Sequence, residues 1–298
     1  MRVLVTGASG YVGRAVVGSL AERGHEPVAM VREGTIRIDG VSATRMADLF
    51  DAGSLRRAVS GVDAVCHLAG LARARESVGE PLRYFRANVV GTVALLEAME
   101  GAGVGRIVFA STGSVYGSPE TQPMTEELPT APPHPYASSK LAAESAIESQ
   151  CGTGRLTAVV IRMLNVAGGV DPDPTRLLPR ALIAARDGSP LAVNGDGSSV
   201  RDYLHVSDAA DAFAAAIDHM PPGGHTTYNV GSGIGSSVNE VIDAVETVTG
   251  QRLSVDHHPA VAEPRIIVSD PAKAIRELAW SPHRSTLEAI VRDAWRAG

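Results

Sequence analysis

The sequence predicts an α/β fold in which a doubly wound parallel sheet is followed by a smaller, mostly helical C-terminal subdomain. Apolar runs of strand length alternate with helical stretches through the first half. These runs are continuous, as in parallel sheets covered on both faces. The alternation stops after about residue 165. We therefore expect a sheet domain over 1–165 and a subdomain over 166–298, with a segment near 226–231 returning to the sheet.

Each expected strand is an apolar run bounded by turns, and each expected helix repeats its apolar residues every three or four positions. The clearest helix spans 82–102, where such spacings separate Leu82, Phe85, Val89, Val93, Leu96 and Met99. Strands are expected at 2–6, 26–31, 42–46, 63–68, 106–110 and 158–163. The other helices are expected at 11–23, 136–150, 207–219, 236–249, 271–278 and 286–296.

The composition is that of a globular protein and excludes several classes of function. Of the 298 residues, 27 are Lys or Arg and 33 are Asp or Glu, so the net charge is -6 and no basic stripe suggests nucleic acid as a partner. Local pairs such as Arg73 and Arg75 are interpreted as solvated helix faces. No apolar run reaches the length of about 18 residues that crosses a membrane. The N-terminal apolar run ends in a glycine turn, which argues against secretion.

Cysteine and histidine usage favours a reduced, cytoplasmic protein without a metal. Two cysteines, Cys66 and Cys151, are too few for a disulfide framework or a Cys-based zinc site. His257 and His258 are adjacent and lack the spacing of metal ligands, so we expect no metal. Lysine is rare, because every basic residue except Lys140 and Lys273 is an arginine.

The strongest motif is a glycine-rich turn between the first expected strand and helix. It reads Thr6-Gly7-Ala8-Ser9-Gly10-Tyr11-Val12-Gly13, with the glycines three residues apart. Glycine permits the tight turn and a close backbone approach to a pyrophosphate, which then faces the helix N-terminus. The motif predicts a Rossmann domain that binds NAD or NADP through Gly7, Gly10, Tyr11, Val12 and Gly13.

The choice between NAD and NADP is expected about twenty residues further on. The second strand ends at Val31 without a carboxylate, and Arg32 follows it. Because an arginine can pair with the 2′-phosphate of NADP, Arg32 slightly favours NADP. The alternative is that Arg32 is an exposed loop residue and that Glu33 binds the ribose of NAD.

Three residues suggest proton transfer at a hydroxyl. Tyr136 and Lys140 lie four residues apart, so a helix places both on one face. The Lys140 ammonium and an oxidised nicotinamide would both favour the Tyr136 phenolate, which makes Tyr136 a candidate general base. Thr112 follows an expected strand at the sheet edge where ligands bind, and its hydroxyl can hydrogen-bond a substrate oxygen.

With these motifs, nearly the whole chain resembles the extended short-chain dehydrogenases/reductases of the nucleotide-sugar epimerase/dehydratase family, and within it the 4-epimerases. The resemblance implies that Thr112, Tyr136 and Lys140 are catalytic and that Lys140 also holds the nicotinamide ribose. It implies further cofactor contacts at Asp48, Leu49, Leu68, Ala69 and Asn88. It implies substrate contacts at Thr112, Ser114, Tyr136, Asn165, Leu177 and Arg201, and a homodimer formed through helices 82–102 and 136–150.

The chain departs from the family pattern at two places. Gly113-Ser114 stands where the dehydratases carry Asp-Glu after the catalytic Thr, which makes a 4,6-dehydratase improbable. Residues 260–265 lack the family's Arg-x-Gly segment, whose arginine binds the nucleotide, and Arg265 is the candidate replacement. We expect an NAD(P)-dependent nucleotide-sugar epimerase that acts through a transient keto-sugar. The alternatives are a one-way NADPH-dependent keto-sugar reductase, favoured by Arg32 and the altered 260–265 segment, and a non-catalytic cofactor sensor.

Overall fold

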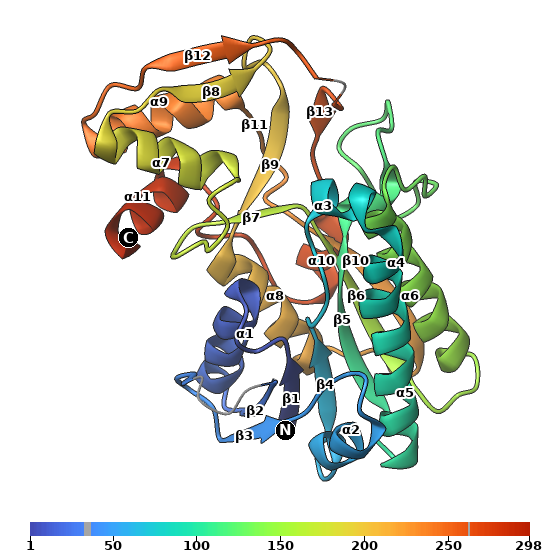
Figure 1. Ribbon diagram of the computed structural model, residues 1–298. Helices are drawn as coiled ribbons and strands as arrows, with labels where there is room; N and C mark the ends of the chain where they lie inside the picture. Colours follow the sequence, from blue (N-terminus) through green and yellow to red (C-terminus); the bar gives the residue numbers. More distant parts are fainter. Residues whose placement is uncertain (33–36, 262) are drawn as a thin grey trace.

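The computed structural model describes residues 1–32, 37–261 and 263–298. Within these residues the main sheet has seven parallel strands in the order β10-β6-β5-β4-β1-β2-β3 (Figure 1). Six of them match the expected strands, and β10 comes from the second half of the chain and pairs with β6. The bounds are β1 Arg2–Thr6, β2 Glu26–Val31, β3 Ala43–Met46, β4 Ala64–His67, β5 Arg106–Thr112, β6 Thr157–Met163 and β10 Gly224–Val230.

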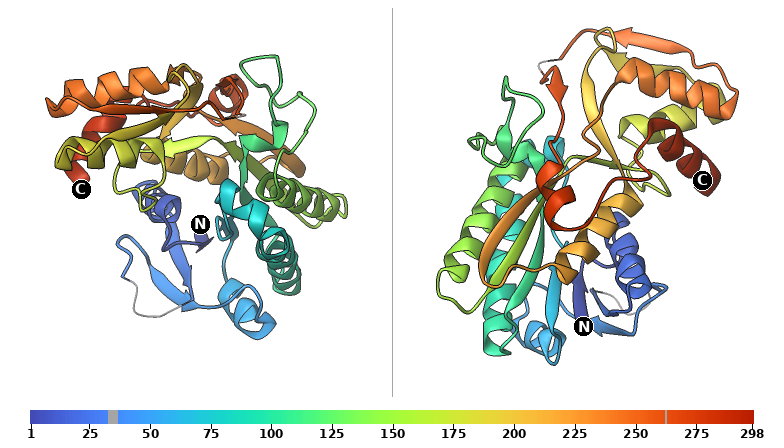
Figure 2. Two further views of the ribbon diagram at one scale, coloured as in Figure 1. Left: turned by 45° about the horizontal axis from the view of Figure 1, so that its top comes forward. Right: turned by 180° about the vertical axis from the view of Figure 1, so that it is seen from behind.

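Helices cover both faces of this sheet, which confirms the doubly wound fold. On one face α1 (Tyr11–Glu22) packs beside α8 (Val206–Asp218), so a helix from the second half completes the sheet domain (Figure 2). On the other face lie α2 (Ala52–Val59), α5 (Gly91–Gly101) and α6 (Pro135–Cys151). Neighbouring residues of β1 point to opposite cores, and the continuous apolar strands are buried for this reason.

The helix expected at 82–102 is one helical run with an unusual middle. It begins as α4 (Pro81–Phe85), passes through a π-helical turn at Arg86–Val90, and continues as α5. Such turns insert an extra residue and often occur at functional sites. Here the turn carries Asn88, which is 1% exposed. The short helix α3 (Ala74–Gly79) precedes this run and borders the cleft described below.

The C-terminal subdomain contains expected helices and, in addition, a helix over 177–187 and short strands that the sequence did not predict (Figures 1 and 2). Strands β7, β9, β11 and β13 form one small sheet, and β8 pairs with β12. Their bounds are β7 Asn165–Ala167, β8 Leu191–Asn194, β9 Val200–His205, β11 Gly235–Ser237, β12 Val255–His258 and β13 Ile266–Ile267. The helices of the subdomain are α7 Leu177–Asp187, α9 Val238–Thr249 and α11 Leu287–Ala297, whereas α10 Ala272–Glu277 packs against β10 of the main sheet. Among the described helices none is long and apolar enough to cross a membrane.

Candidate active site

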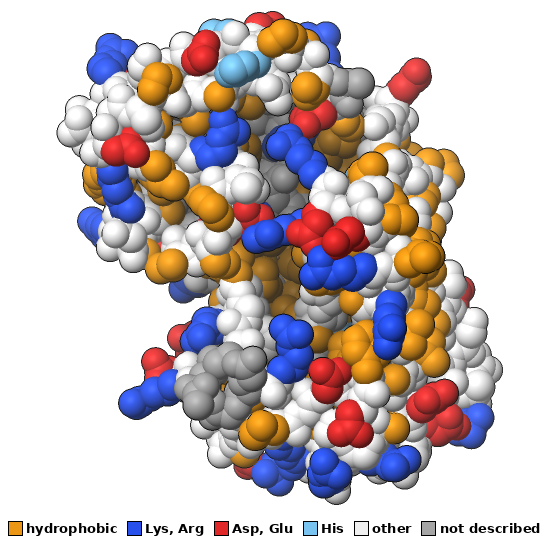
Figure 3. All heavy atoms as spheres, in the orientation of Figure 1, with side chains coloured by type: hydrophobic (Ala, Val, Ile, Leu, Met, Phe, Trp, Pro, Cys, Tyr) orange, Lys and Arg blue, Asp and Glu red, His pale blue; other side chains and the backbone are white. Residues whose placement is uncertain are grey.

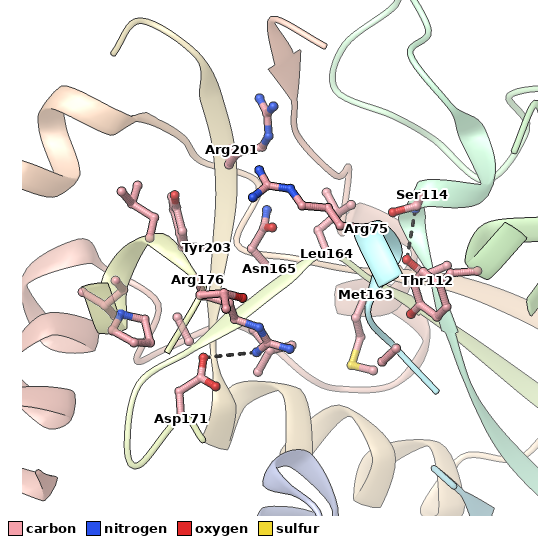
Figure 4. Close-up of a pocket in the computed structure, with 18 of the residues that line it drawn as sticks. Arg75, Thr112, Ser114, Met163, Leu164, Asn165, Asp171, Arg176, Arg201 and Tyr203 are labelled. Atoms are coloured by element: carbon pink, nitrogen blue, oxygen red, sulfur yellow. Dashed lines mark hydrogen bonds and ion pairs between the residues drawn. The ribbon is translucent and has the colours of Figure 1, made fainter. Parts of the chain in front are cut away.

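A cleft of about 760 Å³ lies at the carboxyl ends of the central strands, between the sheet domain and the subdomain. Figure 3 shows it as a hollow with charged side chains along its edges, and Figure 4 shows its lining. This is the edge where ligands bind in open parallel sheets. Many of the residues predicted as site residues line it: Gly7, Gly10, Tyr11, Val12, Gly13, Leu68, Thr112, Ser114, Tyr136, Lys140, Asn165, Leu177 and Arg201.

The glycine turn has the shape that a pyrophosphate needs. Gly7 adopts a φ of +69°, and a Cβ there would come within 2.8 Å of the Ala69 nitrogen. Gly10 caps α1 without a side-chain hydrogen bond, so the first N–H groups of the helix are free to bind an anion. Backbone therefore forms the floor of the cleft at this end, and the residues present fit a dinucleotide cofactor.

Gly13→Ala should abolish cofactor binding while the sheet domain remains folded. A Cβ at residue 13 would overlap the Gly7 carbonyl oxygen and also contact Ala8, so the turn must open. We expect a stability loss of about 1–3 kcal/mol, as for other overpacked sites. Calorimetric titration with NAD and urea unfolding would check both effects, with Gly18→Ala on the same helix as control, because a Cβ there meets no atom within 4 Å. Unchanged NAD affinity would contradict the assignment of the turn.

Asn88 supports the cofactor end from below the cleft surface. Its side-chain amide accepts a hydrogen bond from the Leu71 nitrogen at 2.8 Å and donates to the Leu71 oxygen at 3.0 Å and to Ser139 at 2.9 Å. Asn88 thus holds the loop after β4 and does not line the cleft.

The buried His67, between Thr6 and Thr92, is kept neutral because burial lowers its pKa to about 3.

Tyr136 stands at the start of α6 with its phenol toward Thr112. His134 caps the helix by accepting a hydrogen bond from the Ala137 nitrogen at 3.2 Å, and its ring stacks on Tyr136 at 5.8 Å. Burial raises the pKa of Tyr136, whereas the hydrogen bond with Thr112 and the positive charge of Arg176 lower it. Without cofactor the phenol is therefore the resting form, and catalysis as a base needs added positive charge nearby.

Lys140 lies one helical turn after Tyr136 and is 4% exposed. Its ammonium donates to the Ala110 oxygen at 2.8 Å and lies 4.8 Å from the centre of the Phe109 ring. Burial lowers its pKa to about 8, and the carboxylate of Glu144 opposes this shift. The ammonium also lies beside Gly70, 3.4 Å from where a Cβ of that residue would be. A point charge is therefore placed next to the loop that runs along the predicted cofactor.

A buried polar network anchors the strand ends behind these residues. Glu144 accepts a hydrogen bond from Ser111 and forms an ion pair with Arg162 at 2.6 Å, with both side chains 9% exposed. Arg162 also donates to Tyr116 at 2.8 Å, and Tyr116 donates to Asn229 on β10 at 2.8 Å. Because each buried group has a partner, the network fixes β5, β6 and β10 relative to one another.

Of the predicted substrate residues, Thr112, Ser114 and Tyr136 lie on the sheet-domain side of the cleft, and Asn165, Leu177 and Arg201 lie on the subdomain side (Figure 4). Asn165 begins β7 and donates to the Asp202 oxygen at 3.2 Å, and Arg201 on β9 forms an ion pair with Glu263 at 3.4 Å. Leu177 begins α7 at the cleft wall. Arg265, the candidate replacement for the missing family arginine, is exposed and does not belong to the described lining.

Other predicted cofactor residues also lie off the lining. Arg32 is exposed at the end of β2, and Glu33 lies outside the described residues. Asp48 is exposed and accepts a hydrogen bond from the Phe50 nitrogen at 2.8 Å, while Leu49 packs near Gly91. Ala69 contributes backbone, because its nitrogen donates to Thr6 at 3.1 Å beside Gly7.

The structure brings in residues that the sequence did not single out. Arg75, interpreted above as part of a solvated face, is exposed as expected, and in addition it points into the cleft from α3 (Figure 4). Arg176 lines the centre and pairs with Asp171 at 3.1 Å. Other newly found lining residues are Met163, Leu164 and Tyr203. The Gly-, Asp- and Pro-rich stretch before Arg176 was the available signal for that loop. Among the described residues no cluster of three or more metal-ligating side chains occurs.

Comparison with known proteins agrees with this geometry. The sequence profile of the NAD dependent epimerase/dehydratase family matches residues 3–231. The UDP-glucose 4-epimerase of Streptomyces lividans is 39% identical, with 99% of this chain and 95% of that protein aligned. The crystal structure of UDP-glucose 4-epimerase from Bifidobacterium longum in complex with NAD+ and UDP has a TM-score of 0.91 at 30% identity, covering 100% of this chain and 98% of that one. The Brucella ovis UDP-glucose 4-epimerase in complex with NAD has a TM-score of 0.93 at 31% identity, covering 99% and 97%.

Proposed function

Because the chain belongs to the NAD dependent epimerase/dehydratase family, we propose that it is a nucleotide-sugar 4-epimerase acting through a transient keto-sugar. One observation carries the proposal. A single cleft joins the glycine turn, the Thr112–Tyr136 pair and the Asn165–Arg201 edge, so cofactor, sugar and diphosphate can meet there. The named relatives support a uridine diphosphate hexose as the substrate.

The chain's own residues supply the proton chemistry. Tyr136, as the phenolate, takes the proton of the C4 hydroxyl and later returns it to the same oxygen. The Thr112 hydroxyl, which lies next to Tyr136, hydrogen-bonds the same C4 oxygen and orients it toward the phenolate. Lys140 supplies positive charge beside the loop at Gly70, where it favours the phenolate once a cofactor is in place. A bound nicotinamide would supply the reversible two-electron acceptor at C4, so no net oxidant would be consumed.

The structure around Gly113 supports epimerisation over dehydration. By the resemblance described above, the dehydratases of the family carry Asp-Glu directly after the catalytic Thr, whereas Gly113 and Ser114 here supply no acid or base. A Cβ at residue 113 would come within 2.7 Å of the Leu164 side chain. The space for a carboxylate is therefore already filled by an apolar residue.

We propose NAD as the cofactor, although Arg32 slightly favours NADP at the level of sequence. Arg32 is exposed and stands apart from the described cleft lining, and two solved relatives contain NAD. Protein denatured after purification should release NAD, identified by chromatography and mass. Arg32→Ala should then leave the affinity for NAD within about twofold, the range of most surface changes. Release of NADP, or a large loss of NAD affinity in this variant, would overturn the proposal.

A direct assay separates the epimerase from its rivals. Purified protein should convert UDP-galactose to UDP-glucose without added NAD or NADPH, until both sugars are present at equilibrium. The reductase, which the altered 260–265 segment favours, would instead require a keto-sugar and consume NADPH in equal amount. A cofactor sensor would bind the dinucleotide and do neither. Consumption of NADPH without interconversion would refute the epimerase assignment.

We also propose that the protein forms a homodimer through the α4–α5 run. This run exposes large apolar side chains on one side: Leu82 at 81%, Phe85 at 37%, Val90 at 53% and Val93 at 38%. Figure 3 shows an apolar area of the surface over this run. Exposed apolar patches of this kind mark protein interfaces. Light scattering after gel filtration should give twice the chain mass, and Leu82→Glu should give one chain mass. Unchanged mass for the variant would place the interface elsewhere.

A further inference from the structure

Two arginines from opposite walls of the cleft share one carboxylate. Arg75 reaches from α3 of the sheet domain and lies 3.2 Å from Oε1 of Glu263. Arg201 reaches from β9 of the subdomain and lies 3.4 Å from Oε2 of the same residue. Figure 4 shows the Arg75 side chain reaching across the cleft toward Asn165, with Arg201 above it on β9. One negative charge therefore bridges two positive charges at the cleft mouth.

This arrangement suits a diphosphate better than a carboxylate. The guanidinium fork matches phosphate oxygens bidentately, and two forks can each take one phosphate. A carboxylate neutralises only one of the two charges. Its contacts are also weak, because the side chains of Arg75 and Glu263 are 79% and 41% exposed. A ligand with two or more negative charges can therefore displace Glu263.

Two other arginines of the subdomain, Arg176 and Arg180, also line the cleft, but each is held by another partner. Arg176 forms an ion pair with Asp171 at 3.1 Å, and Arg180 donates a hydrogen bond to the Ala192 oxygen. Residues 260–265 do not carry the Arg-x-Gly segment, and Arg265 is exposed outside the described lining. Glu263 stands in that segment instead and carries the opposite charge. Among the ion pairs of the described residues, Arg75 is the one arginine that is linked to Arg201 across the cleft. Glu263 forms the link, because it pairs with both.

We propose that Arg75 is the second arginine of a diphosphate site formed with Arg201, and that Glu263 occupies this site until a nucleotide diphosphate displaces it. The inference rests on the proposed function, because the diphosphate is that of the nucleotide sugar. It assigns to α3 a binding role and makes Glu263 an internal competitor that weakens substrate affinity. Removal of the Arg75 side chain should therefore weaken diphosphate binding, and removal of the Glu263 charge should strengthen it.

Calorimetric titration with UDP tests this without requiring turnover. Arg75→Ala should weaken UDP binding about tenfold, as expected for loss of one charge-assisted hydrogen bond. Glu263→Gln should tighten it about threefold, because an exposed ion pair must no longer be broken. Matched controls are Arg292→Ala and Glu288→Gln, which alter an exposed ion pair of 3.9 Å on α11, away from the cleft. Arg75→Gln, which keeps the stem of the side chain, should weaken binding like Arg75→Ala.

The outcomes are distinct. Arg75 variants that bind UDP as tightly as Arg292→Ala, or a Glu263→Gln protein that binds no more tightly than wild type, would overturn the inference alone. A wild-type protein without affinity for UDP would overturn the proposed function and the inference with it. Opposite shifts in the two variants, together with unchanged controls, would establish both roles even if the reaction catalysed were the reductase one.

Discussion

Replacing Tyr136 with Phe is expected to lower kcat by about 10²–10⁴-fold, the usual contribution of a general base. The hydroxyl is the only group removed, and the ring keeps its stacking on His134 at 5.8 Å and its edge contact with Tyr84 at 6.4 Å. NAD affinity should therefore change little. Steady-state epimerase assays and NAD titration would measure both. Tyr228→Phe is the control. Tyr228 lies on the edge strand β10, and its hydroxyl donates a hydrogen bond to Glu277 of α10 at 3.1 Å.

The pH dependence gives a second readout of the same residue. The base form is the phenolate, and burial raises the pKa of Tyr136 while Thr112 and Arg176 lower it. Activity of the wild type should thus rise with pH until the phenol has lost its proton. Tyr136→Phe should lack this rise, because nothing remains to titrate there. If Tyr136→Phe turned over as fast as Tyr228→Phe, or kept the same pH profile as wild type, Tyr136 would not be the base.

Lys140→Arg should lower kcat by at least about 100-fold, although both residues are basic. Lys140 is 4% exposed, with its ammonium on the Ala110 oxygen and over Phe109. The longer planar guanidinium cannot occupy the same position, and overpacking of a buried site costs about 1–3 kcal/mol. Lys140→Met, which keeps the volume but removes the charge, should lose turnover with a smaller loss of stability. Urea unfolding and steady-state assays would separate the two effects.

The second lysine provides a matched control. Lys273 donates to the Thr227 oxygen at 2.9 Å and lies 5.1 Å from the centre of the Tyr228 ring, so it also sits on a carbonyl and an aromatic ring. It lies outside the described cleft lining. Lys273→Arg should leave kcat within about twofold, as for most changes away from a site. Equal losses in the two arginine variants would show that the effect is structural and not due to the position of Lys140.

The sheet domain could be predicted because its signals are local. Continuous apolar runs set the buried strands, and the glycine spacing set the turn after β1. The sequence also predicted that one site contains Thr112, Tyr136 and Lys140, and all three line the cleft. This was possible because parallel strands end at one edge of the sheet and because four helical positions make about one turn. The small sheets of the subdomain were missed because they pair short strands far apart in sequence, such as β9 with β11.

The remaining site residues depend on contacts that no local pattern encodes. Asn88 is predicted as a cofactor contact, whereas in the structure a π-helical turn directs its side chain to the backbone of Leu71, 17 residues away. Arg75 belongs to a sequence of charges typical of a solvated helix, and its partner Glu263 is 188 positions away. Only the docking of the subdomain over the carboxyl edge of the sheet places these two side chains on facing walls.

The most direct measurement of the central claim follows the hydrogen at sugar C4. UDP-glucose carrying deuterium at C4 is incubated with the purified protein in ordinary water, without added NAD or NADPH, and the product is examined by mass spectrometry. If Tyr136 exchanges only the hydroxyl proton while a tightly bound cofactor takes and returns the C4 hydrogen, UDP-galactose should retain the deuterium at C4 in full. Loss of deuterium to solvent, or product that forms only when NADPH is supplied, would contradict the account.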